Sequence, residues 1–183
     1  VFAPVISVSG GNKGSSHSGA NDGDGGSFVL RGTGTQALNE VHYRAQNSMR
    51  TMTSFDVFHV RRFVHLPSSS LTMLASVSIS GLETHLVQQS AVIGAVNGRI
   101  DLNCGHFIAE KSVRVYGKHV DIGSINTTLA DAVSVYADAT SSDTVSLTAN
   151  HTLSVDDGTR LSTDNGGSLS ITCKHLMASR SAI

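Results

Sequence analysis

The side chains best suited to catalysis or metal binding are nine histidines, and their spacing forms no known catalytic pattern. The sequence contains no HExxH segment, no His-x-His pair and no GxSxG segment, which are the spacings typical of zinc peptidases and serine hydrolases. A Ser-His-Asp set can assemble from residues far apart in the chain, but no motif marks one here. We therefore expect no catalytic residues. The histidines are His17, His42, His59, His65, His85, His106, His119, His151 and His175.

Asp22 and Asp24 are the one candidate for a metal site, because they alternate with glycine in the segment NDGDGG. Carboxylate oxygens at such spacing suit Ca²⁺. An EF-hand also needs a bidentate glutamate later in a 12-residue loop, and none follows. We therefore expect a flexible Gly-Asp loop, and no metal or other cofactor.

Two N-glycosylation sequons are present, Asn126-Thr127-Thr128 and Asn150-His151-Thr152. This tripeptide is the acceptor signal of the eukaryotic secretory pathway. Asn126 and Asn150 are therefore glycosylation candidates if the chain passes through that pathway.

Composition narrows the class of protein. Charged residues make up only 15% of the 183 residues, and the formal net charge is −1. Without a basic field the chain cannot neutralise many phosphates, so we expect no nucleic-acid partner. No apolar run reaches the ~18–20 residues of a membrane helix, so we expect no transmembrane segment. Serine and threonine take the place of charged residues, which suits strands and turns better than helices.

The first 70 residues read as a Gly-rich N-terminal segment with edge strands. Residues 1–8 alternate apolar and polar residues after Pro4, as an edge strand does. Residues 10–35 are too rich in Gly and small polar residues to fold alone. Residues 36–50 carry apolar residues three and four apart, at Leu38, Val41 and Ala45, which predicts a short capping helix. Residues 51–66 read as a strand.

From residue 71 to residue 175, short alternating runs follow one another, separated by Gly, Asn, Asp and Ser. Apolar residues recur at an offset of twenty, and the segments SVRVYG and AVSVYA align at that offset. This repeat predicts an all-β, parallel β-solenoid, or β-helix, with coils of ~20 residues and a C-terminal tail at 176–183. One stack of core residues is then Ile93, Val113, Val133 and Leu153. A β-sandwich is the alternative fold, because the strand spacing also fits it.

The segment GRIDLNCGHFIAEKSVRVYGKHVDIGS at 98–124 resembles the coils of filamentous-haemagglutinin-type adhesins, which are also rich in Ser, Thr, Asn and Gly. The resemblance lies in composition and period and covers roughly half of the chain. It implies a β-solenoid that is extracellular or at the cell surface. Bactofilin-type polymers and other adhesin domains of this strand repeat look similar.

Cys104 and Cys173 each follow inward-facing apolar residues, 69 positions apart. In a stack of coils their separation along the axis would be roughly 17 Å, far beyond the reach of a disulfide. We therefore expect two buried free thiols that pack as small apolar side chains.

These observations leave three functional hypotheses. The first is a non-enzymatic extracellular structural or adhesive module that contacts a protein or carbohydrate surface. The second is a subunit of a self-assembling fibre or shell, since the open ends of a solenoid can stack into a homo-oligomer or polymer. The third is a β-helical carbohydrate-active enzyme, since such enzymes carry acidic clusters on one coil face. The Asp residues of this sequence fall in or near turns, where Asp is expected anyway.

Overall fold

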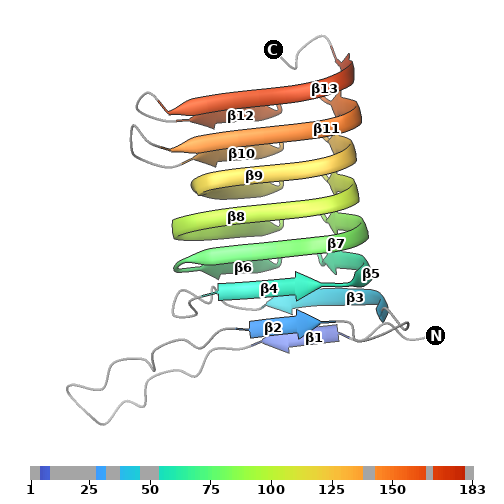
Figure 1. The fold of residues 1–183 in the computed structure, drawn as a ribbon, viewed down its shortest axis with the longest axis vertical. Helices are drawn as coiled ribbons and strands as arrows, with labels where there is room; N and C mark the ends of the chain where they lie inside the picture. The colour runs from blue at the N-terminus through green and yellow to red at the C-terminus, as the bar shows by residue number, and fades with distance from the viewer. Residues whose placement is uncertain are drawn as a thin grey trace.

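The computed structural model of this chain is an all-strand, parallel β-solenoid of about six turns (Figure 1). It describes residues 5–8, 28–31, 38–45, 54–137, 143–163 and 167–179, and the following statements concern these residues. The strands are β1 (Val5–Val8), β2 (Phe28–Arg31), β3 (Leu38–Ala45), β4 (Ser54–Phe58), β5 (Val60–His65), β6 (Ser70–Met73), β7 (Ser76–Val87), β8 (Val92–Ala109), β9 (Arg114–Leu129), β10 (Ser134–Ala137), β11 (Thr144–Val155), β12 (Arg160–Thr163) and β13 (Ser168–Ala178).

Each complete coil passes through three walls. Wall A consists of β6, residues 92–95 of β8, residues 114–117 of β9, β10 and β12, and its short strands lie behind the long ones in Figure 1. Wall B consists of β2, β4 and the first part of β7, with residues 99–103, 119–123, 144–148 and 168–172 above them. Wall C consists of β1, β3, β5 and the last parts of β7, β8, β9, β11 and β13. All pairings are parallel and join one coil to the next.

The predicted solenoid is therefore confirmed, but its coils vary in length. Arg114 pairs with Ser134, twenty residues later, whereas Ser134 pairs with Arg160, twenty-six residues later. The walls keep nearly constant lengths, and the corners and turns between them absorb the difference. Wall A and wall C meet through a tight turn, and wall B and wall C through a corner that is bulged in β7 and β11.

The predicted stack of four core residues is wrong as a single column, although all four side chains are buried. Val113 and Val133 lie in adjacent coils, because the residues that follow them, Arg114 and Ser134, pair directly. Ile93 instead pairs with Val115, and Leu153 lies on wall C, opposite Thr127. On wall A the offset of twenty applies only to the step from Arg114 to Ser134. The step before it is 22 residues and the step after it is 26 residues.

The helix predicted for residues 36–50 is also wrong. Residues Leu38–Ala45 form β3, which pairs in parallel with β5 on one side and with β1 on the other. Val41 and Tyr43 point into the core and are almost fully buried. The edge strand predicted within residues 1–8 is present as β1. The parallel sheet thus begins before residue 71, and β4 and β5 both pair with β7.

The interior changes in character along the rod. Its first coils enclose aromatic rings, among which Tyr43, Phe55, Phe63 and Phe107 are fully buried. From β9 onward the buried large side chains are aliphatic, such as Ile122, Leu129 and Leu147. A continuous apolar core of stacked inward residues is what makes coils that could not fold alone stable together.

Candidate functional site

Asp22 and Asp24, the calcium candidates, lie outside the described residues. Within the described part of the chain, no group of three or more His, Cys, Asp or Glu side chains could hold a metal ion. No described helix is long and apolar enough to cross a membrane.

The two sequon asparagines lie near each other at the corner between walls B and C. Asn126 on β9 is partly exposed, and its amide nitrogen lies 3.5 Å from Nδ1 of His106. Asn150 is exposed and belongs to the irregular stretch of β11 between Ala149 and Thr152. Thr152, the third residue of the second sequon, pairs with Asn126. Both acceptor side chains therefore reach the outer surface of the same corner.

The two cysteines occupy one inward column at this corner. Cys104 pairs with Ser124, Ser124 with Ala149, and Ala149 with Cys173. Both are free, as predicted from the sequence; Cys104 is buried, whereas Cys173 is partly exposed in the last coil. Burial raises the pKa of the Cys104 thiol to about 12, so it stays protonated and is a poor nucleophile.

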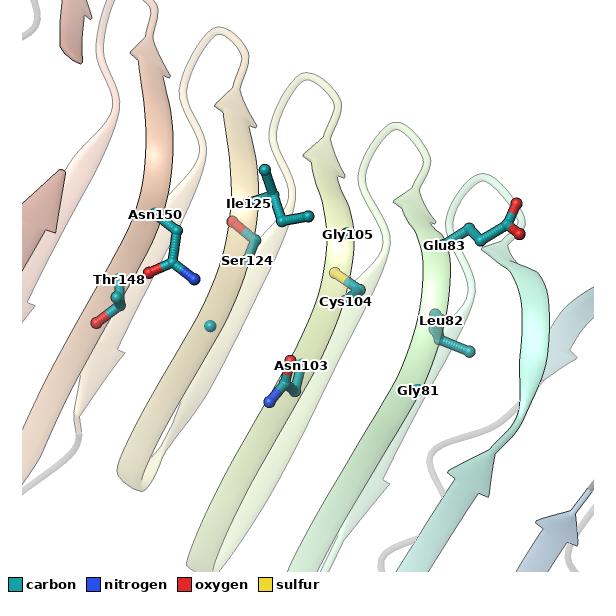
Figure 2. A pocket seen from close by; sticks show the side chains of 11 residues that line it. Gly81, Leu82, Glu83, Asn103, Cys104, Gly105, Ser124, Ile125, Thr148 and Asn150 are labelled. Carbon is teal, nitrogen blue, oxygen red and sulfur yellow. The ribbon is translucent and has the colours of Figure 1, made fainter. Parts of the chain in front are cut away.

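A hollow of about 580 Å³ lies on the outside of this corner, across β7, β8, β9 and β11 (Figure 2). Three of the residues that line it, Gly81, Gly105 and Gly123, have no side chain. The outward column reads Ser80, Asn103, Gly123 and Thr148, so Gly123 leaves a gap between the amide of Asn103 and the hydroxyl of Thr148. Asn150 lines the same hollow. A Cβ placed on Gly123 would meet only ordinary contacts, the nearest at 3.9 Å.

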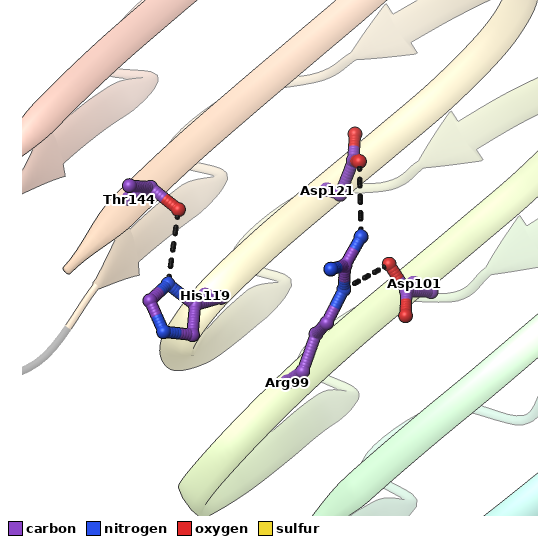
Figure 3. Close-up of polar contacts among 5 residues, drawn as sticks. All are labelled: Arg99, Asp101, His119, Asp121 and Thr144. Atoms are coloured by element: carbon purple, nitrogen blue, oxygen red, sulfur yellow. Dashed lines mark hydrogen bonds and ion pairs between the residues drawn. The ribbon is translucent and has the colours of Figure 1, made fainter.

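The outside of wall B carries paired charges (Figure 3). The guanidinium of Arg99 donates to Asp101 at 2.6 Å and lies 3.5 Å from a carboxylate oxygen of Asp121, one coil further on. His119 Nδ1 lies 3.1 Å from the hydroxyl oxygen of Thr144. The side chains of Arg99, Asp101 and Asp121 are more than a third exposed, so these ion pairs contribute little to stability.

The outside of wall A carries a different set of side chains, which we call the tyrosine–arginine face. Its members are Arg114, Tyr116, Ser134, Tyr136, Arg160 and Ser162. The rings of Tyr116 and Tyr136 stack with centroids 5.6 Å apart and planes within 15°. A shallow hollow of about 220 Å³ is lined by Tyr136, the two arginines and the two serines. Both tyrosines belong to the aligned segments SVRVYG and AVSVYA, and the offset of twenty places them side by side.

The C-terminal coil is open. Leu169, Ile171 and Leu176 are 45%, 46% and 61% exposed, although their column neighbours Val145, Leu147 and Leu153 are at most 1% exposed. Together with Leu161, Val155 and Ala178 they line an apolar hollow of about 510 Å³. No described strand pairs with the far side of β12 or β13. Among the described residues, no strand covers the inward row of this coil.

Comparisons of this chain with known protein families, with curated proteins and with solved structures each found no match. The proposed function is therefore based on the tyrosine–arginine face and on the exposed apolar row of the last coil.

Proposed function

We propose that this protein is a non-enzymatic structural module of the cell exterior, which lengthens when a second copy stacks on its C-terminal coil. The observation that supports this proposal is the row of Leu169, Ile171 and Leu176. Side chains with the same inward orientation are buried wherever another coil lies above them. Covering such a row stabilises the stacked state by roughly 25 cal/mol for each Å² of apolar surface removed from water.

A second copy is the cover that fits best. Every inner coil is covered by a parallel coil of this same chain, so the next layer continues an interface that the molecule already repeats. Among the described strands, β1 pairs only with β3 and β2 only with β4, which leaves a parallel edge at the other end as well. Stacking one end on the other is a head-to-tail contact, and such contacts form filaments when they do not close into rings.

The test is the concentration dependence of particle size, measured by sedimentation velocity or light scattering. We expect the unchanged chain to form larger particles as concentration rises, and the variant Leu169→Ser/Ile171→Ser/Leu176→Ser to remain a small particle. The control is Val96→Ser/Ile125→Ser, which removes two exposed apolar side chains elsewhere and should assemble normally. A small, uniform particle at every concentration for the unchanged chain would overturn the assembly proposal.

Adhesion is a second candidate function, and the tyrosine–arginine face favours it. An adhesive rod needs a firm surface that recognises a partner. This face combines two aromatic rings with two guanidinium groups on adjacent strands of the rod.

A further inference from the structure

The tyrosine–arginine face is built by strict register. Arg114 pairs with Ser134 and Ser134 with Arg160, while Tyr116 pairs with Tyr136 and Tyr136 with Ser162. The two guanidinium groups thus project from strands two layers apart, roughly 10 Å along the axis. Ser134 and Ser162 have short side chains at the positions between and beside them, which opens the hollow that these residues line.

The two tyrosine rings of the face pack against the neighbouring strand and against each other. Tyr116 leans over the neighbouring strand at Gly94, where a Cβ would lie only 2.5 Å from the ring carbon Cζ of Tyr116. Only glycine leaves room for the ring there. Tyr136 then stacks on Tyr116 at 5.6 Å. Because the rings pack before any ligand arrives, binding would lose little side-chain entropy.

The two arginines of this face differ from three other arginines of the rod, each of which has a described carboxylate partner. Arg61 donates to Glu83 at 3.0 Å, Arg62 lies 3.8 Å from Glu40, and Arg99 donates to Asp101 at 2.6 Å. No described carboxylate forms such a pair with Arg114 or Arg160, and the strands of wall A contain neither Asp nor Glu. Two cations therefore face one shallow hollow without an anionic partner in the described part of the chain.

We propose that the tyrosine–arginine face binds an acidic glycan, a chain of sugar rings that carry carboxylate groups. A guanidinium binds a carboxylate through two parallel hydrogen bonds. The serine hydroxyls can donate to or accept from sugar hydroxyls, and the aliphatic C–H groups of a sugar ring pack against tyrosine. Two cations and a net charge of −1 suit widely spaced carboxylates better than the dense phosphates of a nucleic acid.

This inference rests on the adhesive candidate function and is independent of end-to-end assembly. The two can be separated experimentally, because Leu169, Ile171 and Leu176 lie on walls B and C, whereas the face lies on wall A. Arg160 lines both hollows, and the stacking variant leaves it unchanged. The variant that blocks stacking, with serine at positions 169, 171 and 176, should retain glycan binding.

The test is isothermal titration with a uronic-acid oligosaccharide and with the same oligosaccharide after its carboxyl groups have been reduced. We expect the reduced form to bind at least roughly tenfold more weakly, since a charged hydrogen-bond pair is lost. Arg114→Gln and Arg160→Gln should each weaken binding of the acidic form by roughly tenfold. Tyr136→Ser should weaken both forms, because it removes the packing surface for the ring.

Two matched controls locate the site. Arg61→Gln removes the same charge from an arginine on another wall that already has a carboxylate partner, and it should leave binding unchanged. Gly123→Thr fills the separate corner hollow of Figure 2 and should also leave it unchanged. Circular dichroism verifies that each variant is folded. Equal affinity for the acidic and reduced sugars, loss of binding in either control, stronger binding of an RNA homopolymer, or no binding at all would overturn the proposal.

Discussion

The coil that contains β11 and the coil that contains β13 carry the same kind of inward side chain, yet they differ sharply in burial. Leu147 is fully buried and Ile171, directly above it in the same column, is 46% exposed. The alternation of each strand determines which side chains point inward. Whether those side chains leave water depends on the next coil. The comparison shows that an inward side chain of this rod is buried only where a further coil lies over it.

The largest predicted difference comes from truncating both members of this column. Leu147→Ala should reduce the free energy of unfolding by roughly 2–5 kcal/mol, since it leaves a cavity in a closed core. Ile171→Ala should reduce it by less than about 1 kcal/mol in the isolated chain, because the side chain is half in solvent. Urea denaturation of both variants under non-assembling conditions measures the two values. Equal losses would show that the last coil is covered in solution.

The next effect concerns the aromatic part of the interior, where His65 and His85 are fully buried with ring centroids 5.1 Å apart. Neither ring has a hydrogen-bond partner among the described residues. Burial lowers the pKa of His85 to about 3; burial and then the charge of His85 lower that of His65. Below the ordinary histidine pKa of about 6.5 the unfolded chain binds these protons and the folded chain does not.

Stability should therefore be complete above about pH 6.5 and fall as the pH drops toward 3, by at most about 1.4 kcal/mol per pH unit for each histidine. Thermal unfolding between pH 7 and pH 4 measures the slope. His85→Leu should reduce it, whereas His119→Leu, on the exposed surface, should have a smaller effect. An unchanged slope in His85→Leu would show that other groups dominate the acid response.

The smallest predicted change in the free energy of unfolding concerns the turns at Ala132 and Gly158. Ser68, Ser90, Ser112, Ala132 and Gly158 form one column of turn residues between walls C and A, joined by backbone hydrogen bonds, and all have positive φ. Ala132 adopts a φ of 57° without the freedom of glycine, and Gly158 adopts 68° in the next turn. Ala132→Gly should stabilise the chain, and Gly158→Ala destabilise it, by roughly 0.5–1 kcal/mol each. Urea denaturation measures both changes. Destabilisation by Ala132→Gly, or stabilisation by Gly158→Ala, would contradict the shared turn conformation.

The parts of the fold that the sequence predicted are those that depend on local alternation. The runs after residue 71 form strands whose apolar residues point inward, and the offset of twenty correctly places Val113 beside Val133. The parts that it missed depend on length differences that alternation does not report. The segment 36–50 carries a spacing that suits a helix, but Leu38–Ala45 within it pairs with β5 and β1 and forms a strand, because tertiary contacts outweigh weak local preference.

The candidate surfaces were less predictable than the fold. The tyrosine–arginine face joins three coils, and its two arginines pair with the same serine because one coil step is twenty residues and the next is twenty-six. A constant offset of twenty would place Ser154, not Arg160, two coils above Arg114. The corner hollow likewise needs Gly123 to fall between Asn103 and Thr148 in one column.

The sequence by itself determined that this chain forms short parallel-stacking strands with a dry interior and two separate thiols, since a two-residue alternation and the position of each cysteine within it are local properties. Only the tertiary structure decided which side chains share a column, which arginines have a carboxylate partner and which apolar row lies uncovered. The physical reason is that coil register depends on the lengths of the corners and turns, and those lengths are set by packing across coils.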